Sequence, residues 1–582
     1  MRSDPKISAL LFMSAARLIK ILSLFACGFV AAGWLSPDPG SASETPSYVG
    51  NAACQRCHES IARAYAETPM ARSSGEARAE FGEAEFTHPP SGVRYRMKGE
   101  GGKVFLEYER VGAAAIKGRQ QLHYFIGSNA AGRSYLFSLD RFLFQSPVTY
   151  YSQSKRWGVS PGYEADREMR LNRPVDANCL FCHASQSQPI YGAQNRFADQ
   201  PFKHEGVSCE RCHGPGSLHV EGKAKLVNPA KLDPARRDSI CAQCHLSGES
   251  RVELPNKRLA QFRPGDLLAD YVSFFVFENA AGRALKVNSH VENLAGSACK
   301  LKSGDRMSCM SCHDPHSVPK PQEKAAWYRS RCLQCHQEGK LSGVHNRAGA
   351  PGLDCAGCHM PKARAVDGGH AVMTDHGIPL IGKRPETETG PPGMLHKMDS
   401  AGGARKLVPF PGFRSDDRML GLAYAEVALI GGAQFHESEA LRLLTAALNA
   451  LAPNGAVRAG DAEFFARLGF LHQQRGALPQ AARAYEIALQ AEPRRTDALV
   501  NLGGIYAAQG RIEEADELWR EALRRNAGLT EAAVNLARVY RSEGKLSQAR
   551  ELLQRAIQFD PDSGQVRQLL KDIESESDKL RR

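Results

Sequence analysis

The chain has 582 residues, of which 42% are hydrophobic and 24% are charged. These proportions are typical of a globular protein, and they exclude a largely disordered chain and one embedded in a membrane. The length exceeds what a single hydrophobic core organises, so we expect two or more domains. The formal net charge of +12 would suit a nucleic-acid-binding or anionic lipid-binding protein.

Residues 1–43 have the pattern of an export signal. Basic residues precede an apolar run at residues 21–35, and the small residues Ser41 and Ser43 follow it. We expect a cleaved signal peptide, with an uncleaved N-terminal anchor and lipidation at Cys27 as alternatives. All three predict a periplasmic or otherwise extracytoplasmic protein, either soluble or attached to the membrane at its N-terminus.

Seven copies of Cys-x-x-Cys-His follow, and they use fourteen of the sixteen cysteines. This motif is the signature of c-type haem attachment. The cysteines are Cys54 and Cys57, Cys179 and Cys182, Cys209 and Cys212, Cys241 and Cys244, Cys309 and Cys312, Cys332 and Cys335, and Cys355 and Cys358. The histidines are His58, His183, His213, His245, His313, His336 and His359. We refer to them as motifs 1 to 7.

The spacing of the motif has a chemical reason. Two thiols about one helical turn apart can each bond one vinyl group of haem, and the next residue then offers its imidazole to the iron. Zinc sites, disulfide frameworks and thioredoxin-like pairs do not require a histidine after every second cysteine. We therefore predict seven haem c groups. Their propionates would reduce the charge of +12 to roughly +5, so we expect no nucleic-acid partner.

Each iron needs a second ligand on the opposite face of the porphyrin. A connection around the ring edge is too long for His313 and His316, which are three positions apart, and it is borderline between His213 and His219. Such histidines are expected to bind neighbouring haems, which would clamp successive haems together. The favoured distal ligands are His219, His290, His316, His345, His370 and His376, whereas His88, His123, His204 and His396 are less favoured.

Between motifs 1 and 2 the pattern alternates as in β-strands. Residues 93–97 and 103–111 predict a hairpin, and residues 270–278 predict a further strand. Aromatic residues here, with Tyr150 and Tyr151 among them, are expected to pack in a core, with a substrate pocket as the alternative. Cys299 lies outside the motifs; we expect a buried thiol, and iron ligation is the alternative.

Residues 47–385 resemble the multihaem cytochromes c of the c-552/c-554-like family. The likeness is carried by YVGNAACQRCHESIARAYAETPMA, SCERCHGPGSLHV, MSCMSCHDPH and CAGCHMPK…TDH. The resemblance implies closely stacked haems with mainly bis-histidine ligation, and it supports His219, His316, His370 and His376 as ligands. Where relatives often have a histidine after the first motif, this chain has Met70, a candidate thioether ligand. No motif replaces its histidine with the lysine typical of reductases in the wider superfamily.

A Gly/Pro-rich linker is predicted at residues 386–415, followed by a helical repeat domain at 416–575. Small residues recur every 34 positions, as in Gly469 and Gly503, which is the tetratricopeptide period. Three clear repeats span 462–563, and a degenerate one precedes them. Tyr485, Trp519 and Leu553 are expected to fill the groove between paired helices, and residues 562–580 to form a capping helix.

The predicted fold is therefore mainly α: a haem-packed domain with few regular elements and a small β insertion, then an α-helical solenoid. The predicted function is electron transfer along seven haems, with the concave face of the repeats docking a protein or peptide and a redox protein as partner. Whether the chain is an enzyme stays open. One alternative is an oxidoreductase that acts on a small nitrogen or sulfur compound at one open-coordinate haem. The other is a haem-based redox sensor or scaffold.

Overall fold

A computed structural model describes residues 45–112, 115–278, 285–337, 354–379, 405–431, 434–451 and 461–581. Internal contacts group Met1–Pro46 and Ser47–Arg582 as separate units. The elements described here all belong to the second unit. Across these ranges we find no helix that combines the length and the apolar character needed to cross a bilayer.

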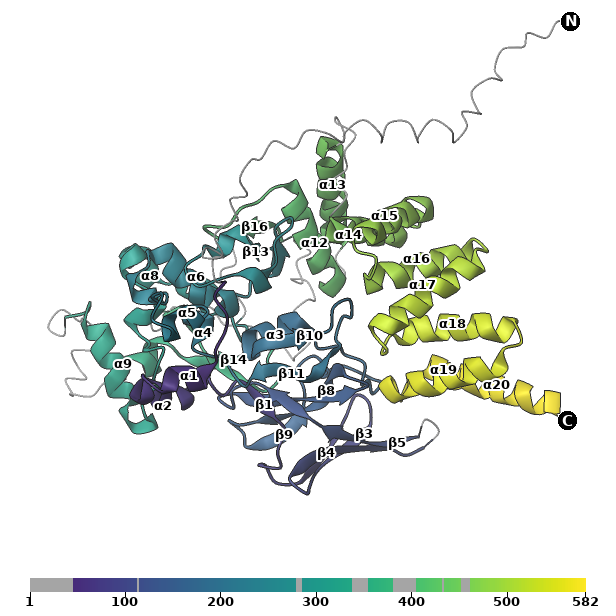
Figure 1. Cartoon of the computed structure of the whole chain (residues 1–582), viewed down its shortest axis with the longest axis horizontal. Coiled ribbons are helices and arrows are strands. Elements are labelled where there is room, and N and C mark those ends of the chain that lie inside the picture. The colour runs from purple at the N-terminus through teal and green to yellow at the C-terminus, as the bar shows by residue number, and fades with distance from the viewer. Residues whose placement is uncertain are drawn as a thin grey trace, which may run out of the picture. The chain divides into compact units, whose positions relative to one another are not determined.

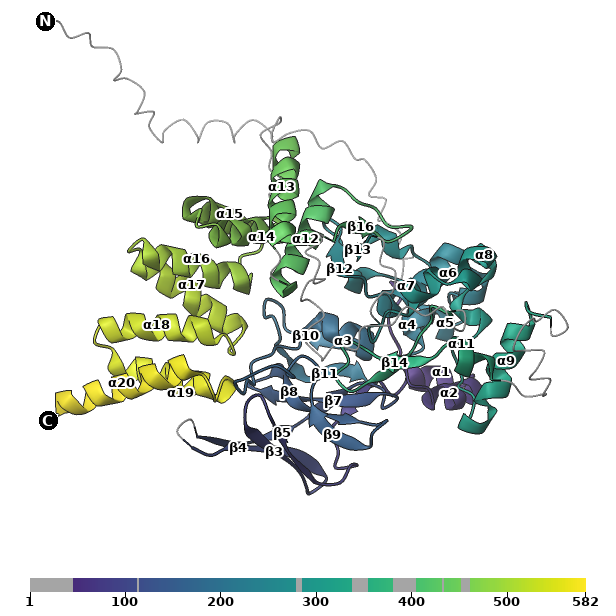
Figure 2. The same cartoon turned by 180° about the vertical axis from the view of Figure 1, so that it is seen from behind.

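Two short helices, α1 (Asn51–Gln55) and α2 (Glu59–Ala66), carry motif 1 and are followed by nine strands in two antiparallel sheets (Figure 2). One sheet has the order β2-β3-β4-β5 and the other β1-β6-β7-β8-β9. The strands are β1 (Ser74–Glu76), β2 (Ala84–His88), β3 (Val93–Glu100), β4 (Lys103–Arg110), β5 (Ile116–Leu122), β6 (Tyr124–Ile126), β7 (Gly132–Leu139), β8 (Phe142–Tyr151) and β9 (Arg156–Val159).

The predicted hairpin is confirmed. Strands β3 and β4 pair from Arg94 opposite Glu109 to Glu100 opposite Lys103. Gly101 and Gly102 turn the chain with φ angles of 57° and 78°, which side chains rarely adopt. Alternate residues of both strands are buried, so each strand presents one apolar face to a core. The insertion is larger than the small sheet that the sequence suggests.

The aromatic residues beside these strands pack in the core. Tyr151, Trp157 and Tyr163 are buried. The Tyr151 hydroxyl donates a hydrogen bond to the Val159 carbonyl at 2.7 Å, and the Trp157 indole donates to the Gly82 carbonyl at 3.1 Å. Their polar atoms are thus satisfied inside the protein, as buried tyrosine and tryptophan require. The expected packing role is confirmed for these residues.

Motifs 2 to 7 lie on short helices and turns joined by small two- and three-stranded sheets (Figure 1). The helices are α3 (Ala177–His183), α4 (Glu210–His213), α5 (Ser217–Val220), α6 (Pro234–His245), α7 (His290–Ala295), α8 (Ala298–Ser303), α9 (Lys324–Leu333) and α11 (Cys355–His359). The strands are β10 (Ser185–Pro189), β11 (Phe197–His204), β12 (Ser250–Glu253), β13 (Val272–Phe277), β14 (Lys362–Arg364), β15 (Val372–Thr374) and β16 (Leu407–Pro409). Short 3-10 helices are η1 (Pro229–Lys231), η2 (Leu259–Gln261), η3 (Leu268–Asp270), η4 (Gly304–Arg306), η5 (Cys309–Ser311) and η6 (Pro321–Glu323).

Local capping explains where three motif helices begin. Asp176 accepts hydrogen bonds from the first amides of α3, Asp233 caps α6, and Asp354 caps α11. These carboxylates satisfy amides that have no partner inside the helix. The predicted strand at 270–278 is confirmed as β13. It pairs with β12 on one side and with β16 on the other, so residues 407–409 of the segment 386–415 complete a sheet.

From Asp417 onward the chain forms antiparallel helix pairs stacked in sequence (Figure 1). The helices are α12 (Asp417–Gly431), α13 (Gln434–Leu451), α14 (Ala462–Gln474), α15 (Leu478–Ala491), α16 (Thr496–Ala508), α17 (Ile512–Arg525), α18 (Thr530–Ser542), α19 (Leu546–Phe559) and α20 (Gly564–Arg581). The predicted fold class is confirmed: a mainly helical chain with a β insertion and a C-terminal solenoid.

The 34-residue spacing of small residues has the expected structural reason. A Cβ atom on Gly469 would lie 2.9 Å from the Tyr485 ring, and one on Gly503 would lie 2.6 Å from the Trp519 ring. Glycine at these crossings therefore lets each helix pair close around a buried aromatic side chain. Tyr485, Trp519 and Leu553 are all buried, and α20 forms the predicted capping helix.

Candidate haem-binding site

A single helical turn sets the geometry of the Cys-x-x-Cys-His motifs. In motif 1 the amide of His58 donates to the carbonyl of Cys54 at 3.0 Å, and motifs 3, 5 and 6 have the equivalent bond. This i to i−4 bond places the two thiols on adjacent corners of one turn, with the imidazole beside the second. Such a turn can present two thiols to one porphyrin edge and a ring nitrogen to the iron.

The thiols of different motifs contact one another in pairs. Hydrogen bonds join Cys54 of motif 1 to Cys209 of motif 3, and Cys182 of motif 2 to Cys244 of motif 4. The bond from Cys244 is the main reason why the pKa of Cys182 is lowered to about 7. Attachment points that are far apart in sequence are therefore neighbours in space.

Two further hydrogen bonds between thiols, together with two electrostatic influences between thiols, extend this network to all seven motifs. Hydrogen bonds join Cys241 to Cys309 and Cys332 to Cys355. Cys212 of motif 3 also raises the pKa of Cys241 and Cys244 of motif 4 electrostatically, and Cys312 of motif 5 raises that of Cys332 of motif 6. These mutual influences link the motifs in the order 1, 3, 4, 5, 6, 7, with motif 2 branching from motif 4.

Solvent exposure follows this order. The exposed thiols are Cys57, Cys179, Cys335 and Cys358, which belong to motifs 1, 2, 6 and 7. Every thiol of motifs 3, 4 and 5 is partly buried. Motifs 1 and 7 at the two ends, motif 2 on the branch and motif 6 therefore reach the surface, whereas the thiols of motifs 3, 4 and 5 are only partly exposed.

Two non-motif histidines face motif histidines as parallel rings. The ring of His219 lies 6.4 Å from that of His58 at an interplanar angle of 15°, and His316 lies 5.9 Å from His213 at 7°. An imidazole nitrogen bonds a transition metal at about 2 Å, so two ligands on opposite sides of one metal have ring centres roughly 6 Å apart. The ring-centre separations of both pairs match this distance.

Four more histidines form a half-buried cluster. His245 and His290 lie 5.1 Å apart, His290 and His376 4.7 Å, and His313 and His376 6.2 Å. Burial is the largest influence on all four rings: it lowers the pKa of His245 to about 4 and of His290 to about 3, and it lowers those of His313 and His376 as well. Neutral imidazole, the form that binds a metal, is thus favoured here.

Backbone carbonyls orient several of these rings. The Nδ1–H of His213 donates to Val227 at 2.8 Å, that of His219 to Ala224 at 3.3 Å, that of His376 to Thr374 at 3.0 Å, and that of His359 to Pro379 at 3.2 Å. Because a carbonyl can only accept, the proton sits on Nδ1 and Nε2 keeps its lone pair. This is the tautomer that a metal-binding histidine adopts when its second nitrogen is anchored.

Three of the less favoured histidines make other contacts. His88 is buried, and its nitrogens bond to the Ser91 hydroxyl at 2.8 Å and the Glu164 carbonyl at 3.1 Å. The Nδ1 of His123 accepts the Ser138 amide at 3.1 Å, which leaves the proton on Nε2. The ring of His204 lies against Gly50. His396 and the favoured candidate His345 lie outside the described residues.

The remaining candidates have distinct surroundings. His370 packs edge-on against Tyr151 at 5.0 Å, with an Arg364 nitrogen 3.3 Å from its Nδ1. Met70 is half-buried, and its carbonyl accepts the Val207 amide at 2.9 Å. Cys299 is partly buried, and burial raises the pKa of its thiol. In the described ranges, no three or more His, Cys, Asp or Glu side chains converge as a metal-binding group.

Two buried carboxylates that sequence reasoning missed hold the motif segments together. Glu210 stands inside motif 3, is 1% exposed, and accepts the amides of Val49, Gly50 and Gly216 at 2.8–2.9 Å. Glu292 accepts the Gly248 amide at 2.9 Å, next to motif 4. The sequence signal for Glu210 is its position between the two cysteines of motif 3. We recognise no sequence signal for Glu292.

Comparisons with known proteins agree with this arrangement. Three family models match: a tetratricopeptide repeat at residues 494–562, a doubled CXXCH motif at 301–341, and cytochrome c554 and c-prime at 151–214. Each covers a minor part of the chain, and the last two fall on the motif segments whose turns are described above.

Three curated relatives also match, and the chain spans less than two thirds of each. Dissimilatory sulfite reductase MccA of Wolinella succinogenes is 25% identical over 34% of this chain and 29% of its own length. Multiheme cytochrome MtrA of Shewanella baltica is 22% identical over 34% of this chain and 57% of its own length. C-type polyheme cytochrome OmcC of Geobacter sulfurreducens is 25% identical over 28% of this chain and 20% of its own length.

Solved structures of repeat proteins resemble part of the chain. The crystal structure of MamA has 19% sequence identity and a TM-score of 0.21, and the match covers 25% of this chain and 77% of that one. The first TPR of Spaghetti (RPAP3), bound to an HSP90 peptide, has 18% sequence identity and a TM-score of 0.19. The match covers 20% of this chain and 92% of that one. Separate segments of the chain thus match models for cytochrome c554 and c-prime, for a doubled CXXCH motif and for tetratricopeptide repeats, and two of the relatives that it resembles are multihaem cytochromes.

Proposed function

We propose that this chain is an exported electron carrier with seven covalently bound haem c groups, docked to a redox partner through its repeats. Electron transfer is the coarse function that the multihaem relatives support. The observation that carries the proposal is the set of hydrogen-bonded thiols, which links motif 1 with motif 3, motif 2 with motif 4, motif 4 with motif 5, and motif 6 with motif 7. When bound, haem iron supplies one-electron chemistry between its ferric and ferrous states.

The paired rings support a specific set of distal ligands. His219 would face His58 in motif 1, and His316 would face His213 in motif 3. His290 would serve motif 4, next to His245, and His376 would serve motif 5, opposite His313. Met70 is not needed under this assignment. His345 and His370 stay candidates for the irons of the remaining motifs.

The spatial order of the motifs supports a path with exposed ends. Motifs 1, 2 and 7 end the main series or its branch, and each has an exposed thiol. An exposed attachment edge is where a partner can approach closely enough to exchange an electron. The enclosed motifs 3, 4 and 5 would connect these ends, and Glu210 and Glu292 would fix the backbone around them.

Extracytoplasmic location follows from the same chemistry. Haem attachment to Cys-x-x-Cys-His takes place outside the cytoplasm in bacteria, in keeping with the export pattern at residues 1–43. The repeats supply a protein-binding surface, since stacked helix pairs create a concave face on which an extended partner segment can lie.

Spectroscopy of the purified, haem-loaded protein tests the proposal. We expect seven haems by mass spectrometry, low-spin ferric spectra, and no carbon monoxide binding after reduction. Replacing one distal ligand, as in His316→Ala, should create one high-spin haem that binds carbon monoxide. His123→Ala is the matched control and should leave the spectra unchanged. A His316→Ala protein with a wild-type spectrum would reject the assignment.

The similarity to dissimilatory sulfite reductase MccA favours one alternative. In that case one iron keeps an open position, and the chain is an oxidoreductase for a small sulfur or nitrogen compound. A native protein that contains one high-spin haem and binds carbon monoxide would support this alternative over the carrier.

A further inference from the structure

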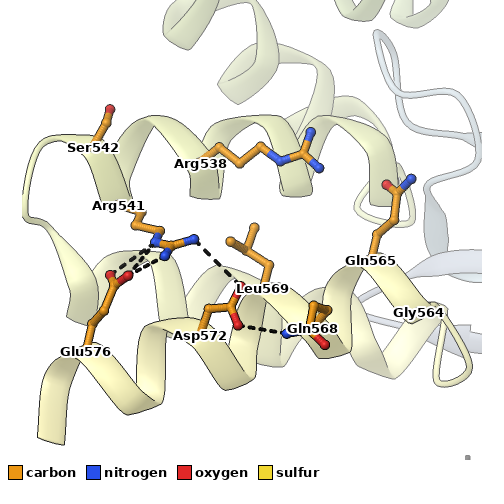
Figure 3. Close-up of a pocket in the computed structure, with 9 residues that line it drawn as sticks. All are labelled: Arg538, Arg541, Ser542, Gly564, Gln565, Gln568, Leu569, Asp572 and Glu576. Atoms are coloured by element: carbon orange, nitrogen blue, oxygen red, sulfur yellow. Dashed lines mark hydrogen bonds and ion pairs between the residues drawn. The ribbon is translucent and has the colours of Figure 1, made fainter.

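The charged side chains in the pocket between α18 and α20 compensate one another (Figure 3). Arg541 bonds to Glu576 through its Nε at 3.0 Å and lies 3.8 Å from Asp572. Together with Arg538, the charged side chains that line this pocket sum to zero. The haem-binding segment contains a cation in a different situation, the Arg211 side chain of motif 3.

The side chain of Arg211 reaches from motif 3 to motif 2. Its guanidinium donates a hydrogen bond to the carbonyl of Phe181 at 2.8 Å and lies 3.5 Å from that of Ala184. The first of these residues directly precedes Cys182, and the second directly follows His183. The guanidinium also lies over the Phe181 ring, 4.1 Å from its centre. These contacts hold one cation beside the haem-attachment turn of another motif.

The surroundings of this cation are apolar and contain little counter-charge. Arg211 is half-buried, and Phe181 and Ala184, which it contacts, are buried, so water and salt screen the charge only weakly. Within the described ranges of the chain, Arg211 forms no ion pair with a carboxylate. The adjacent Glu210 carboxylate accepts three backbone amides instead.

Other charges at motif 2 do not cancel this cation. The hydrogen bond from Cys244 contributes most to the lowered pKa of Cys182, and the positive charges of Arg251 and Arg211 lower that pKa further. The carboxylate at this motif is Asp176, which caps the N-terminal end of α3, whereas Arg211 lies at the C-terminal end. Two cations and one anion thus border motif 2 and leave a net positive charge.

We propose that Arg211 raises the reduction potential of the haem on motif 2, so that one attachment motif supplies a charge that tunes another. The inference rests on the proposed function, because it requires a haem on this motif. Reduction removes one positive charge from the iron, so a fixed cation nearby stabilises the reduced form over the oxidised form. The propionates of a haem extend from the edge opposite its vinyl groups, and Arg211 approaches the side where a thiol bonds a vinyl group.

Spectroelectrochemical titration of the full-length, haem-loaded protein tests the proposal. Arg211→Gln removes the charge but keeps a side-chain donor for the Phe181 carbonyl. We expect the share of absorbance that belongs to one haem to move to lower potential. Its reduction equilibrium constant should fall about tenfold, which is about 59 mV for a one-electron couple. Haem content and low-spin spectra should stay those of the wild type.

Two further variants separate charge from structure. Arg211→Lys keeps the positive charge, so it should restore most of the wild-type potential. Arg56 occupies the same place in motif 1, between the two cysteines, but it is exposed to water. Arg56→Gln is therefore the matched control, and it should shift the titration curve much less, because water and salt screen an exposed charge.

A variant without the motif 2 haem assigns the shift to that haem. Cys179→Ser combined with Cys182→Ser removes both attachment thiols, and mass spectrometry verifies that one haem is lost. In this background Arg211→Gln should leave the remaining potentials unchanged.

Four results would overturn the proposal. They are equal titration curves of the wild type and Arg211→Gln, an equal fall in potential in Arg211→Lys, an undiminished shift without the motif 2 haem, and loss of that haem from Arg211→Gln. The last result would show that the side chain serves attachment instead. The carrier function is tested separately by the haem count of the native chain. Unchanged potentials in a protein that carries all its haems leave electron transfer standing.

Discussion

The haem-binding segment and the repeats are held together in different ways. Helices α1, α8, α9 and α11 in the first region contain five to ten residues and bury none of their side chains. In the second region α14, α16 and α18 have thirteen residues each and bury seven. Short helices are only marginally stable unless tertiary contacts stabilise them. The comparison indicates that the repeats carry their own core, whereas α1, α8, α9 and α11 contribute no buried side chain to one.

The largest expected effect comes from withholding the cofactor. If the chain is produced without haem attachment, we expect the motif segment to lose its native structure, because its short helices have few buried contacts of their own. The repeats should remain folded. Limited proteolysis followed by mass spectrometry measures this, with the haem-loaded protein as control. Equal protection of both regions would contradict the comparison.

A substitution in the repeats should act in the opposite way. Trp519→Ala removes a fully packed indole, so the repeats should lose about 3–5 kcal/mol of unfolding free energy. Haem content and visible spectra should stay unchanged, because no motif touches this side chain. Chemical denaturation followed by far-ultraviolet circular dichroism gives the free energy. Trp327→Ala, on the half-buried helix α9, is the matched control and should leave the repeats unaffected.

The smallest of these effects concerns the loop after α19. Burial raises the pKa of Asp560 to about 6, so the folded state holds this proton more tightly than the unfolded chain does. The contribution of the Asp560 carboxyl to the free energy of unfolding is therefore fully present below about pH 4, and it is lost as the pH rises through 6. Asp560→Asn should stabilise the protein at pH 7 by roughly 1–3 kcal/mol.

At pH 4 the same variant should differ little from the wild type, because Asp560 is then protonated in the folded state and about half protonated in the unfolded chain. Thermal unfolding at the two pH values measures the difference, and Asp578→Asn on the exposed end of α20 is the control. An equal effect at both pH values would show that hydrogen bonding, and not ionisation, governs this site.

Much of the site could be read from the sequence because its chemistry is local. The two thiols and the imidazole of each motif occupy one helical turn, and the backbone bond from His58 to Cys54 realises that turn. The 34-residue period likewise predicts the repeats, since Gly503 must meet Trp519 at the same point of each pair. The nine-stranded insertion was underestimated, because strands such as β1 and β6 have only three residues.

What the sequence alone predicted were the attachment residues, the repeat unit and that His316 cannot easily share an iron with His313, because these depend on spacing along a covalent chain. The tertiary structure decided which distant groups meet: His219 with His58, His316 with His213, and the thiols of motif 4 with those of motifs 2 and 5. It also placed Glu210 on the amides of Val49 and Gly50. Such contacts join residues up to 161 positions apart, and only chain folding, which is set by the whole of the packing, brings them together.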